Sequence, residues 1–293
     1  MQDFKDKVAI ITGGAGGVGR AIGLALAREG AKIVVADIEA QATEDTVNEI
    51  KALGAEAIGL YADVTKVESM KQAQADAVAA FGDYHLVFAN AGIGAGEFGM
   101  LWDYDDNDWN WGFNVNVWGV INTIRAFMPL LAERNIESHF VITGSANGAV
   151  VKLPYTPIYT CTKAAVQSIT ENLYFQMQQL NSNVQINALM PGPHSVDTGI
   201  FNSVRNRPED LPSNPNKPDF GMKCADDMVT MMGQAGIKVE ITQPEDVAET
   251  ALQGLRDNSF WIMPLPEAIE NAVAKYHESI RNRTAPPMIE LDG

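Results

Sequence analysis

The 293-residue chain is long enough for one large α/β domain or for two small ones. A net charge of -16 argues against nucleic acid and against an anionic membrane as partners. Two cysteines cannot form a disulfide framework or a structural zinc site, and the four histidines form no ligand cluster, so no metal is expected. No apolar run is as long as a membrane span or a signal core, so we expect a cytoplasmic protein.

A short apolar strand over residues 7–12 leads directly into a glycine-rich turn over residues 12–19. A helix is expected next, with apolar residues at helical spacing and Gly30 as its stop. Glycines allow a tight turn and let backbone N–H groups approach a pyrophosphate at the positive helix N-terminus. A G-x-G-x-x-G match alone is weak, but the strand before it and the helix after it favour a dinucleotide site.

The second predicted strand, residues 32–37, ends in the acidic residue Asp37, eighteen residues after Gly19. A carboxylate at this place is positioned to bind the adenosine ribose hydroxyls, and it would repel a 2′-phosphate. Neither Gly16 nor Ile38 supplies a compensating positive charge. The sequence therefore favours NAD over NADP as the cofactor.

Strands and helices continue to alternate along the chain. We expect a helix over residues 38–53, a strand over 57–61, a helix with capping-box spacing at 65–68 that runs to 81, a strand over 85–88, a long helix over 103–134, a strand over 140–143, a helix to about 180 and a strand over 184–190. This alternation predicts an α/β fold with a Rossmann-type doubly wound parallel sheet and helices on both of its faces.

The last third of the chain begins with a proline-rich stretch over residues 202–219 and a Met-rich amphipathic segment over 220–236. A helix over residues 242–257, a seventh strand over 260–263, a helix over 266–283 and a tail over 284–293 are expected to follow. There is no internal repeat or linker in the sequence. We therefore predict one domain over residues 1–293, with an insertion at about 193–236 that covers the substrate and a C-terminal extension at about 265–293.

Tyr159 and Lys163 are four residues apart, so on a helix they lie on one face with about 5–6 Å between their Cβ atoms. A free tyrosine has a pKa of about 10 and is a poor base at neutral pH, but a neighbouring ammonium favours the phenolate. Lowering that pKa to about 7 needs about 4 kcal/mol, which we expect from the lysine together with a positively charged cofactor ring. Ser145 follows the fifth strand and is placed to hydrogen-bond the oxygen whose proton Tyr159 takes.

A Tyr-x-x-x-Lys match is common by chance and gains weight only from its context. That context is an ordered set of residues: the glycine-rich turn, Asn90-Ala91-Gly92, Ser145, the Tyr159 and Lys163 pair, and Pro191-Gly192. In this order they make the chain resemble the short-chain dehydrogenase/reductase family over roughly residues 5–198. The family's Thr-Gly-x-x-x-Gly-x-Gly pattern is matched by Thr12, Gly13, Gly17 and Gly19.

The resemblance implies roles for four catalytic residues. Ser145 would position the substrate oxygen, Tyr159 would be the acid/base, and Lys163 would bind the ribose and polarise the tyrosine. Asn116 matches the asparagine that supports a water leading protons to the lysine. The resemblance also implies a homo-oligomer, a tetramer or a dimer, built on the two long helices around Trp109 and Tyr174.

A larger set of residues is implied to bind the cofactor, with Asp63 and Val64 flanking the adenine. The set consists of Gly13, Gly17, Val18, Gly19, Asp37, Ile38, Asp63, Val64, Asn90, Ala91, Gly92, Tyr159, Lys163, Pro191, Gly192, Val196 and Thr198. Three positions depart from the family pattern. Ala89 replaces a frequent asparagine, Ser145 lies one residue further from the tyrosine than usual, and Thr198 comes late after Pro191-Gly192.

The expected substrate pocket is apolar because the loops after the fourth, fifth and sixth strands are rich in large apolar residues. Its predicted lining comprises Ser145, Val151, Leu153, Tyr155 and Met222, with Phe98, Met100, Trp102, Val150 and Met228 from the same loops. The charged residues Glu97 and Lys152 are interpreted as solvated. A bulky hydrophobic alcohol, aryl or steroid-like, is the expected substrate, by analogy with hydroxysteroid and lignin-type benzylic alcohol dehydrogenases of the family.

The leading interpretation is an NAD-dependent dehydrogenase that acts on the CH–OH group of a secondary alcohol, or on its ketone. One alternative is an NADP-dependent ketoreductase of the same fold, which Asp37 disfavours. Another is a non-catalytic NAD-sensing protein, although such relatives commonly lose the tyrosine or the lysine. A structural subunit is a third alternative, which no feature of the sequence favours.

Overall fold

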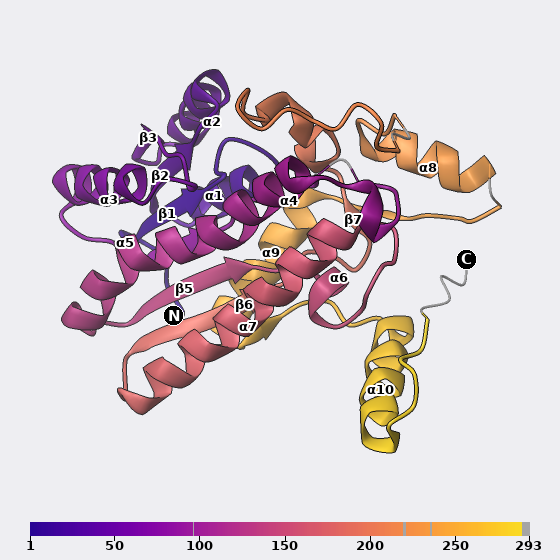
Figure 1. The fold of residues 1–293 in the computed structure, drawn as a ribbon. Helices are drawn as coiled ribbons and strands as arrows, with labels where there is room; N and C mark the ends of the chain where they lie inside the picture. The colour runs from indigo at the N-terminus through magenta and orange to yellow at the C-terminus, as the bar shows by residue number, and fades with distance from the viewer. Residues whose placement is uncertain (96, 219–220, 235, 289–293) are drawn as a thin grey trace.

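The computed structural model describes residues 1–95, 97–218, 221–234 and 236–288. Its centre is a seven-stranded parallel sheet in the spatial order β3-β2-β1-β4-β5-β6-β9 (Figure 1). The strands are β1 Val8–Thr12, β2 Lys32–Asp37, β3 Ala57–Tyr61, β4 Leu86–Ala89, β5 Ser138–Thr143, β6 Val184–Leu189 and β9 Trp261–Ile262. The predicted Rossmann-type seven-stranded sheet is confirmed. The strand order reverses between β1 and β4, and sheets of this kind bind ligands outside the strand carboxyl ends at that point.

Helices cover both faces of the sheet, and each layer packs on its own hydrophobic core (Figure 1). One core contains side chains from α1 Gly17–Arg28, α2 Ala40–Ala52 and α9 Pro244–Arg256. The other contains side chains from α3 Val67–Phe81, α5 Gly119–Arg134 and α7 Pro157–Gln179. The sheet is therefore buried between two helical layers.

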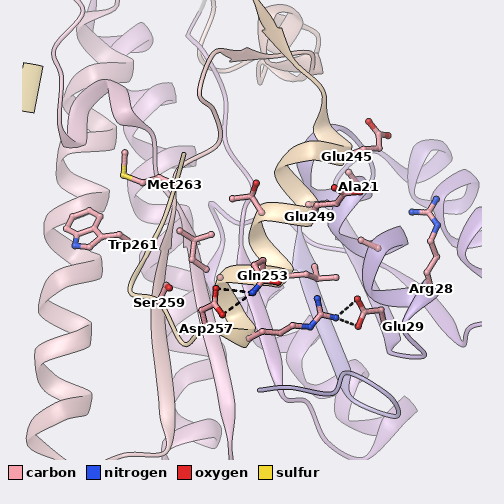
Figure 2. A pocket seen from close by; sticks show the side chains of 17 residues that line it. Ala21, Arg28, Glu29, Glu245, Glu249, Gln253, Asp257, Ser259, Trp261 and Met263 are labelled. Carbon is pink, nitrogen blue, oxygen red and sulfur yellow. Dashed lines mark hydrogen bonds and ion pairs between the residues drawn. The ribbon is translucent and has the colours of Figure 1, made fainter. Parts of the chain in front are cut away.

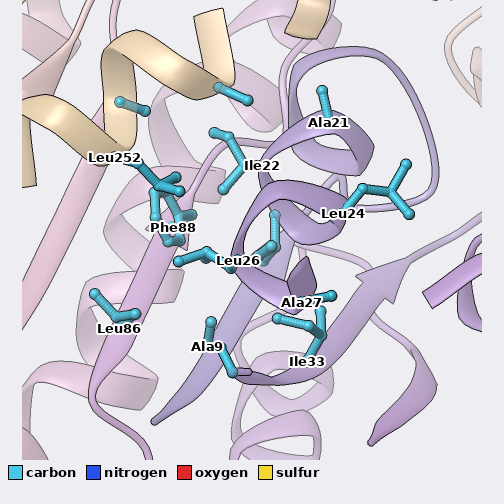
Figure 3. Close-up of a cluster of buried hydrophobic side chains, with 14 of the residues drawn as sticks. Ala9, Ala21, Ile22, Leu24, Leu26, Ala27, Ile33, Leu86, Phe88 and Leu252 are labelled. Atoms are coloured by element: carbon cyan, nitrogen blue, oxygen red, sulfur yellow. The ribbon is translucent and has the colours of Figure 1, made fainter. Parts of the chain in front are cut away.

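The residues of β1 divide alternately between these two cores. Ala9 and Ile11 belong to the core beneath α1 and α9, which Figure 3 shows from close by, and Val8 and Ile10 belong to the opposite core. All five residues of the strand are buried. Because both faces are covered, the strand is a continuous apolar run in the sequence rather than an alternating one. Such a run was enough to locate the strand.

The long helix predicted over residues 103–134 is divided into segments. A short 3-10 turn, η1 Leu101–Asp103, precedes α4 Asp106–Phe113, and the π-helical segment η2 Asn114–Trp118 joins α4 to α5. α4 begins later than predicted because the Asp105 side chain caps it, accepting from the N–H groups of Asn107 and Asp108. By length and composition the stretch Asp106–Arg134 is able to cross a membrane, but half of its apolar window is buried, as in a core helix.

The predicted capping box at residues 65–68 is wrong. α3 begins at Val67 with Lys66 as its N-cap residue. The backbone N–H and the hydroxyl of Thr65 both donate to the Asp63 carboxylate, at 2.9 and 2.7 Å. Thr65 therefore closes a turn before the helix, since its hydroxyl bonds a carboxylate and not a backbone N–H group of the first helical turn.

Several short elements near the strand ends were not predicted. They are α6 Ala146–Ala149, the two-stranded parallel sheet of β7 Ser195–Val196 and β8 Ile241–Thr242, and the 3-10 helix η3 Gly199–Asn206. The predicted Met-rich segment contains α8 Ala225–Gln234, but residues 219–220 and 235 lie outside the described residues. The last helix, α10 Glu267–Asn282, projects from the body of the protein (Figure 1). Residues 289–293 of the predicted tail also lie outside the described residues.

Candidate active site

A cavity of about 2820 Å³ opens at the carboxyl ends of the strands, where the strand order reverses. Its walls come from the turn after β1, the ends of β2 and β3, and the loops after β4, β5 and β6. Residues of α8 and α10 border its outer part. The cavity therefore occupies the place at which doubly wound sheets bind their ligands.

A separate depression of about 730 Å³ lies between α1, α9 and β9 (Figure 2). Several of its polar side chains are engaged with one another. Arg256 pairs with Glu29, and the Gln253 amide donates to Asp257 at 3.0 Å. This pairing is typical of a solvated surface depression, so the candidate site is the cavity at the strand ends.

Close backbone contacts explain the glycines of the turn after β1. A Cβ at Gly19 would lie 2.2 Å from the Gly13 carbonyl oxygen, and a Cβ at Gly17, which has a φ of +49°, would lie 2.9 Å from Thr198 Cγ2. At Gly16, the N-cap of α1, such a Cβ would meet no described atom within 4 Å apart from its own chain neighbours. The turn presents bare backbone and the positive helix N-terminus to the cavity, which fits the pyrophosphate of a dinucleotide.

Asp37 closes this end of the cavity from the last position of β2. Its carboxylate accepts from the N–H groups of Ala15 at 3.0 Å, Ile38 at 2.7 Å and Glu39 at 3.1 Å. Burial raises the pKa of the Asp37 carboxyl, and the three backbone hydrogen bonds oppose that rise. The carboxylate thus has a fixed position beside the glycine turn, where a ribose would lie.

Asn90 ties the glycine turn to the neighbouring strands. Its amide donates to the carbonyl oxygens of Thr12 and Gly13 at 3.1 and 3.2 Å, and its amide oxygen accepts from the Thr143 hydroxyl at 3.1 Å. The Thr12 hydroxyl in turn accepts from the backbone N–H of Asn90 at 3.0 Å. These contacts fix the relative positions of β1, β4 and β5 at the edge of the cavity.

Ser145, Tyr159 and Lys163 meet where β5 ends. Ser145 follows the strand and is the N-cap of α6, while Tyr159 and Lys163 lie in the first two turns of α7. Ser145 is close enough to the Tyr159 phenol to act as a hydrogen-bond partner that lowers its pKa. The Lys163 ammonium donates to the Thr143 carbonyl at 2.9 Å and lies 5.7 Å from the centroid of the Tyr159 ring. The three side chains therefore form one connected group.

Burial controls the ionisation of this group. It raises the pKa of the Tyr159 phenol, which the Ser145 hydrogen bond lowers and the charge of Glu97 raises further. Burial also lowers the pKa of the Lys163 ammonium to about 8. Lys163 is not among the groups that shift the pKa of Tyr159, so stabilisation of the phenolate by its ammonium stays a prediction.

Asn116 lies in the π-helical segment between α4 and α5. Its amide oxygen accepts from the Ile93 N–H at 2.8 Å, and its amide nitrogen donates to the Ile93 carbonyl at 3.0 Å and to the Thr162 hydroxyl at 3.1 Å. A Cβ at Gly92 would lie 3.3 Å from the Asn116 amide oxygen and 3.6 Å from Lys163 Nζ. Asn116 therefore joins the loop after β4 to α7 beside the lysine. π-helical turns of this kind are frequent at functional sites.

A sequence model of the family described as short chain dehydrogenase matches residues 7–209. The chain belongs to the short-chain dehydrogenase family. A solved short chain dehydrogenase/reductase from Burkholderia phymatum, in complex with NAD, is 36% identical with a TM-score of 0.87 over 98% of each chain. A CLA biosynthesis dehydrogenase/reductase from Lactiplantibacillus plantarum is 31% identical over 91% of each chain. A C alpha-dehydrogenase from Sphingobium sp. (strain NBRC 103272 / SYK-6) is 30% identical and covers 100% of this chain and 91% of its own.

Most residues that the sequence predicts to bind the cofactor of this short-chain dehydrogenase line the cavity. They are Gly13, Gly17, Val18, Asp37, Ile38, Asp63, Val64, Asn90, Ala91, Gly92, Tyr159, Lys163, Pro191, Val196 and Thr198. Among the described residues, Gly19, Gly192 and the predicted catalytic Asn116 are not part of its lining. Gly19 permits the turn, as its contact with Gly13 indicates, and Asn116 acts on neighbouring backbone.

The predicted substrate residues Ser145, Val151, Leu153, Tyr155 and Met222 also line the cavity. Phe98 lines it as well and stacks on Tyr155, with 5.5 Å between ring centroids. Met100 and Trp102 do not, which makes that part of the prediction wrong. They lie at and within the turn η1, with 47% and 79% of their surfaces exposed.

The interpretation of Glu97 as a solvated residue is wrong. Glu97 is 8% exposed, and its carboxylate accepts from the N–H groups of Ile158 and Tyr159, the latter at 2.8 Å. Lys152 is exposed as predicted, and its ammonium donates to the Gly148 carbonyl at 2.7 Å. The prediction fails for Glu97 and not for Lys152 because the Glu97 carboxylate bonds to backbone N–H groups about sixty residues away in sequence.

The sequence did not reveal the ion pairs that hold the segment after β6. Arg207 and Lys217 both contact Asp108 Oδ1, at 2.6 and 3.1 Å, and all three side chains are buried. Nearer the cofactor end, the Arg205 guanidinium contacts the Glu39 carboxylate at 2.6 Å. These contacts attach the segment to α4 and to the end of β2. Charge complementarity between separated segments is the signal that could have indicated them.

Proposed function

We propose that this short-chain dehydrogenase interconverts a bulky hydrophobic secondary alcohol and its ketone, with NAD as the cofactor. The observation that supports this best is that Ser145, Tyr159 and Lys163 line the same cavity as the glycine turn and Asp37. A proton carrier and a dinucleotide site facing one cavity are what alcohol oxidation by hydride transfer requires.

In the oxidation direction, the Tyr159 phenol first loses its own proton to solvent, and the phenolate then accepts the proton of the substrate hydroxyl. A bound nicotinamide cofactor would supply the hydride acceptor. Ser145 donates a hydrogen bond to the substrate oxygen and keeps it beside the phenol. In the reduction direction, Tyr159 returns the proton to that oxygen. The Lys163 ammonium stays beside the tyrosine ring, bonded to the Thr143 carbonyl.

The substrate class rests on the apolar side of the cavity. Val151, Leu153, Tyr155, Met222 and Met228 line this part, and flexible methionines suit an adaptable wall against a bulky ligand. A screen of hydroxysteroids, benzylic alcohols and aliphatic alcohols with NAD tests the proposal. We expect the highest kcat/KM among the aryl or steroid-like alcohols, and a small sugar acid as the best substrate would contradict it.

Asp37→Ala is expected to narrow the preference for NAD over NADP. In the wild type a 2′-phosphate would face the fixed Asp37 carboxylate, and two like charges near a protein surface repel by about 1–4 kcal/mol at 4 Å. The measurement is the ratio of kcat/KM for NAD to kcat/KM for NADP. Asp45→Ala, on the exposed face of α2, is the matched control and should leave the ratio unchanged. A wild-type preference for NADP would refute the NAD assignment.

We also propose that residues 193–236 act as a lid over the bound substrate. Cleavage between residues 202 and 221 by a protease should slow when NAD and a substrate analogue are both bound. Arg207→Met should be cleaved faster than the wild type, because the buried Asp108 carboxylate then keeps only Lys217 as a cationic partner. Arg125→Met, on the exposed face of α5, should be cleaved like the wild type. Equal cleavage rates with and without ligands would contradict the lid.

We further propose a cytoplasmic homo-oligomer, a tetramer or a dimer. Large aromatic side chains on the two long helices support it, since Trp118 is 49% exposed and Phe175 is 59% exposed. Exposed aromatic residues are enriched at protein interfaces. Light scattering of the purified protein measures the state directly, and a monomer at micromolar concentration would contradict the proposal.

A further inference from the structure

The first turn of α7 is capped from a distant loop. The first N–H groups of a helix have no partner inside the helix, and a side chain just before it usually satisfies one of them. Here the preceding residue is Thr156, but its hydroxyl bonds to the Asn147 amide at 2.9 Å and to the Thr160 hydroxyl at 3.3 Å. Glu97 supplies the cap instead, because its two carboxylate oxygens accept from the N–H groups of Ile158 and Tyr159.

This cap acts on the main chain of the proposed acid/base residue itself. The backbone N–H of Tyr159 bonds to Glu97 at 2.8 Å, and its phenol lies in reach of Ser145, which lowers the pKa of the phenol. A negative charge at the N-terminus of a helix is also stabilised by the helix dipole. The Glu97 carboxylate therefore fixes where α7 begins and, with it, the position from which the phenol reaches the cavity.

Glu97 is buried among other titratable groups. These are Lys217 from the segment after η3, Tyr104 from the loop before α4, Tyr159 and Cys161 from α7, and the carboxylates of Asp103 and Asp108 beyond Tyr104. The Lys217 ammonium donates to the Ala95 carbonyl at 3.2 Å and supplies the nearby positive charge. Burial nevertheless raises the pKa of Glu97 to about 7, and its charge raises the pKa of Tyr159.

We propose that Glu97 is a positioning residue that holds the start of α7, and thereby Tyr159, and that its charge opposes formation of the phenolate. The inference rests on the proposed function, in which Tyr159 carries the proton. It assigns the reaction a group that lies at the cavity wall and acts through the main chain of the tyrosine. The charge of Glu97 then adds to the effect of burial and moves the pH at which oxidation begins toward alkaline values.

The test compares Glu97→Gln, which keeps the shape but removes the charge, with Glu97→Ala, which removes the cap. Glu97→Ala should lower kcat by about 10–100-fold with little change in KM, because a small misplacement of a reacting group costs this much. In both variants the rising limb of kcat/KM against pH, in the oxidation direction, should move toward acid. Glu68→Gln, exposed on α3, is the matched control and should move neither quantity.

If the rising limb of the kcat/KM pH profile stays at the wild-type pH in both variants, the proposal is overturned, whatever happens to kcat. A purely structural cap would not change the ionisation of Tyr159. Retained activity in Tyr159→Phe would instead overturn the proposed function, so the two failures are distinguishable.

Thermal unfolding gives a second measurement that does not depend on activity. The folded protein binds the Glu97 proton more tightly than the unfolded one between pH 4.5 and about 7. The Tm of Glu97→Gln should therefore rise relative to the wild type between pH 5 and pH 8, and a constant difference would count against the buried charge.

Discussion

Replacing Tyr159 with phenylalanine is expected to lower kcat by about 10²–10⁴-fold, the usual contribution of a positioned general acid or base. The phenyl ring keeps the contact with Lys163, and Ser145 and the Glu97 cap remain in place. Only the atom that carries the proton is removed. The Kd for NAD, measured by quenching of protein fluorescence or by calorimetry, should therefore stay close to that of the wild type.

Tyr174→Phe provides the matched control, because it makes the same change on the same helix. Tyr174 packs edge to face against Phe260, with 4.8 Å between ring centroids, and lies away from the cavity. Its kcat should equal that of the wild type. Near-normal turnover in Tyr159→Phe would contradict the mechanism, and a large loss of NAD affinity would mean that the hydroxyl also supports the cofactor site.

Elements with a strong local pattern could be located from the sequence alone. The bounds of β2 agree with the predicted range at both ends, because a buried parallel strand is a continuous apolar run bounded by polar residues. The bounds of the edge strand β3 agree as well, although its residues are only partly buried. The strands β7 and β8 have two residues each, too few for any periodicity to appear. Likewise, a π-helical turn within a helix leaves the helical spacing of the sequence almost unchanged.

The residues of the candidate site likewise fall into those that a local sequence pattern predicts and those that depend on contacts distant in sequence. The glycine turn, Asp37 and the Tyr159 and Lys163 pair are local patterns whose spacing carries their geometry, and the structure brings them to one cavity. The contacts of Glu97 cross 61 and 62 residues, and the Arg207 to Asp108 pair crosses 99. Average exposure predicts that such charged side chains are solvated. Only the fold reveals which of them find partners.

The direction in which the pKa of Tyr159 shifts could not be predicted from the sequence either. Spacing alone placed an ammonium near Tyr159 and gave that charge the largest effect. In the structure burial has the largest effect, and the Lys163 ammonium is directed to the Thr143 carbonyl. Desolvation depends on everything that surrounds a group, so a pair of residues four positions apart does not determine it.

Lys163→Met is expected to lower kcat by about 10²-fold or more and to weaken NAD binding about tenfold, because hydrogen bonds of charged groups contribute about 1.5–3 kcal/mol. The Lys163 side chain is 4% exposed, and its ammonium is the contact between the end of β5 and the Tyr159 ring. Methionine fills a similar space without a donor, so the Thr143 carbonyl loses its partner. The loss of affinity separates this variant from Tyr159→Phe, in which only the rate should fall.

Stability provides an independent measurement of the same lysine. Its folded pKa of about 8 lies below the ordinary 10.5, so between these values the unfolded chain binds more protons and wild-type stability rises with pH. Lys163→Met lacks this dependence, and its Tm should therefore fall relative to the wild type between pH 8 and pH 10.5. Lys71→Met, with its side chain 52% exposed on α3, is the matched control and should follow the wild type in rate, NAD affinity and Tm. A Lys163→Met enzyme with normal NAD affinity would mean that the ammonium acts on the tyrosine alone.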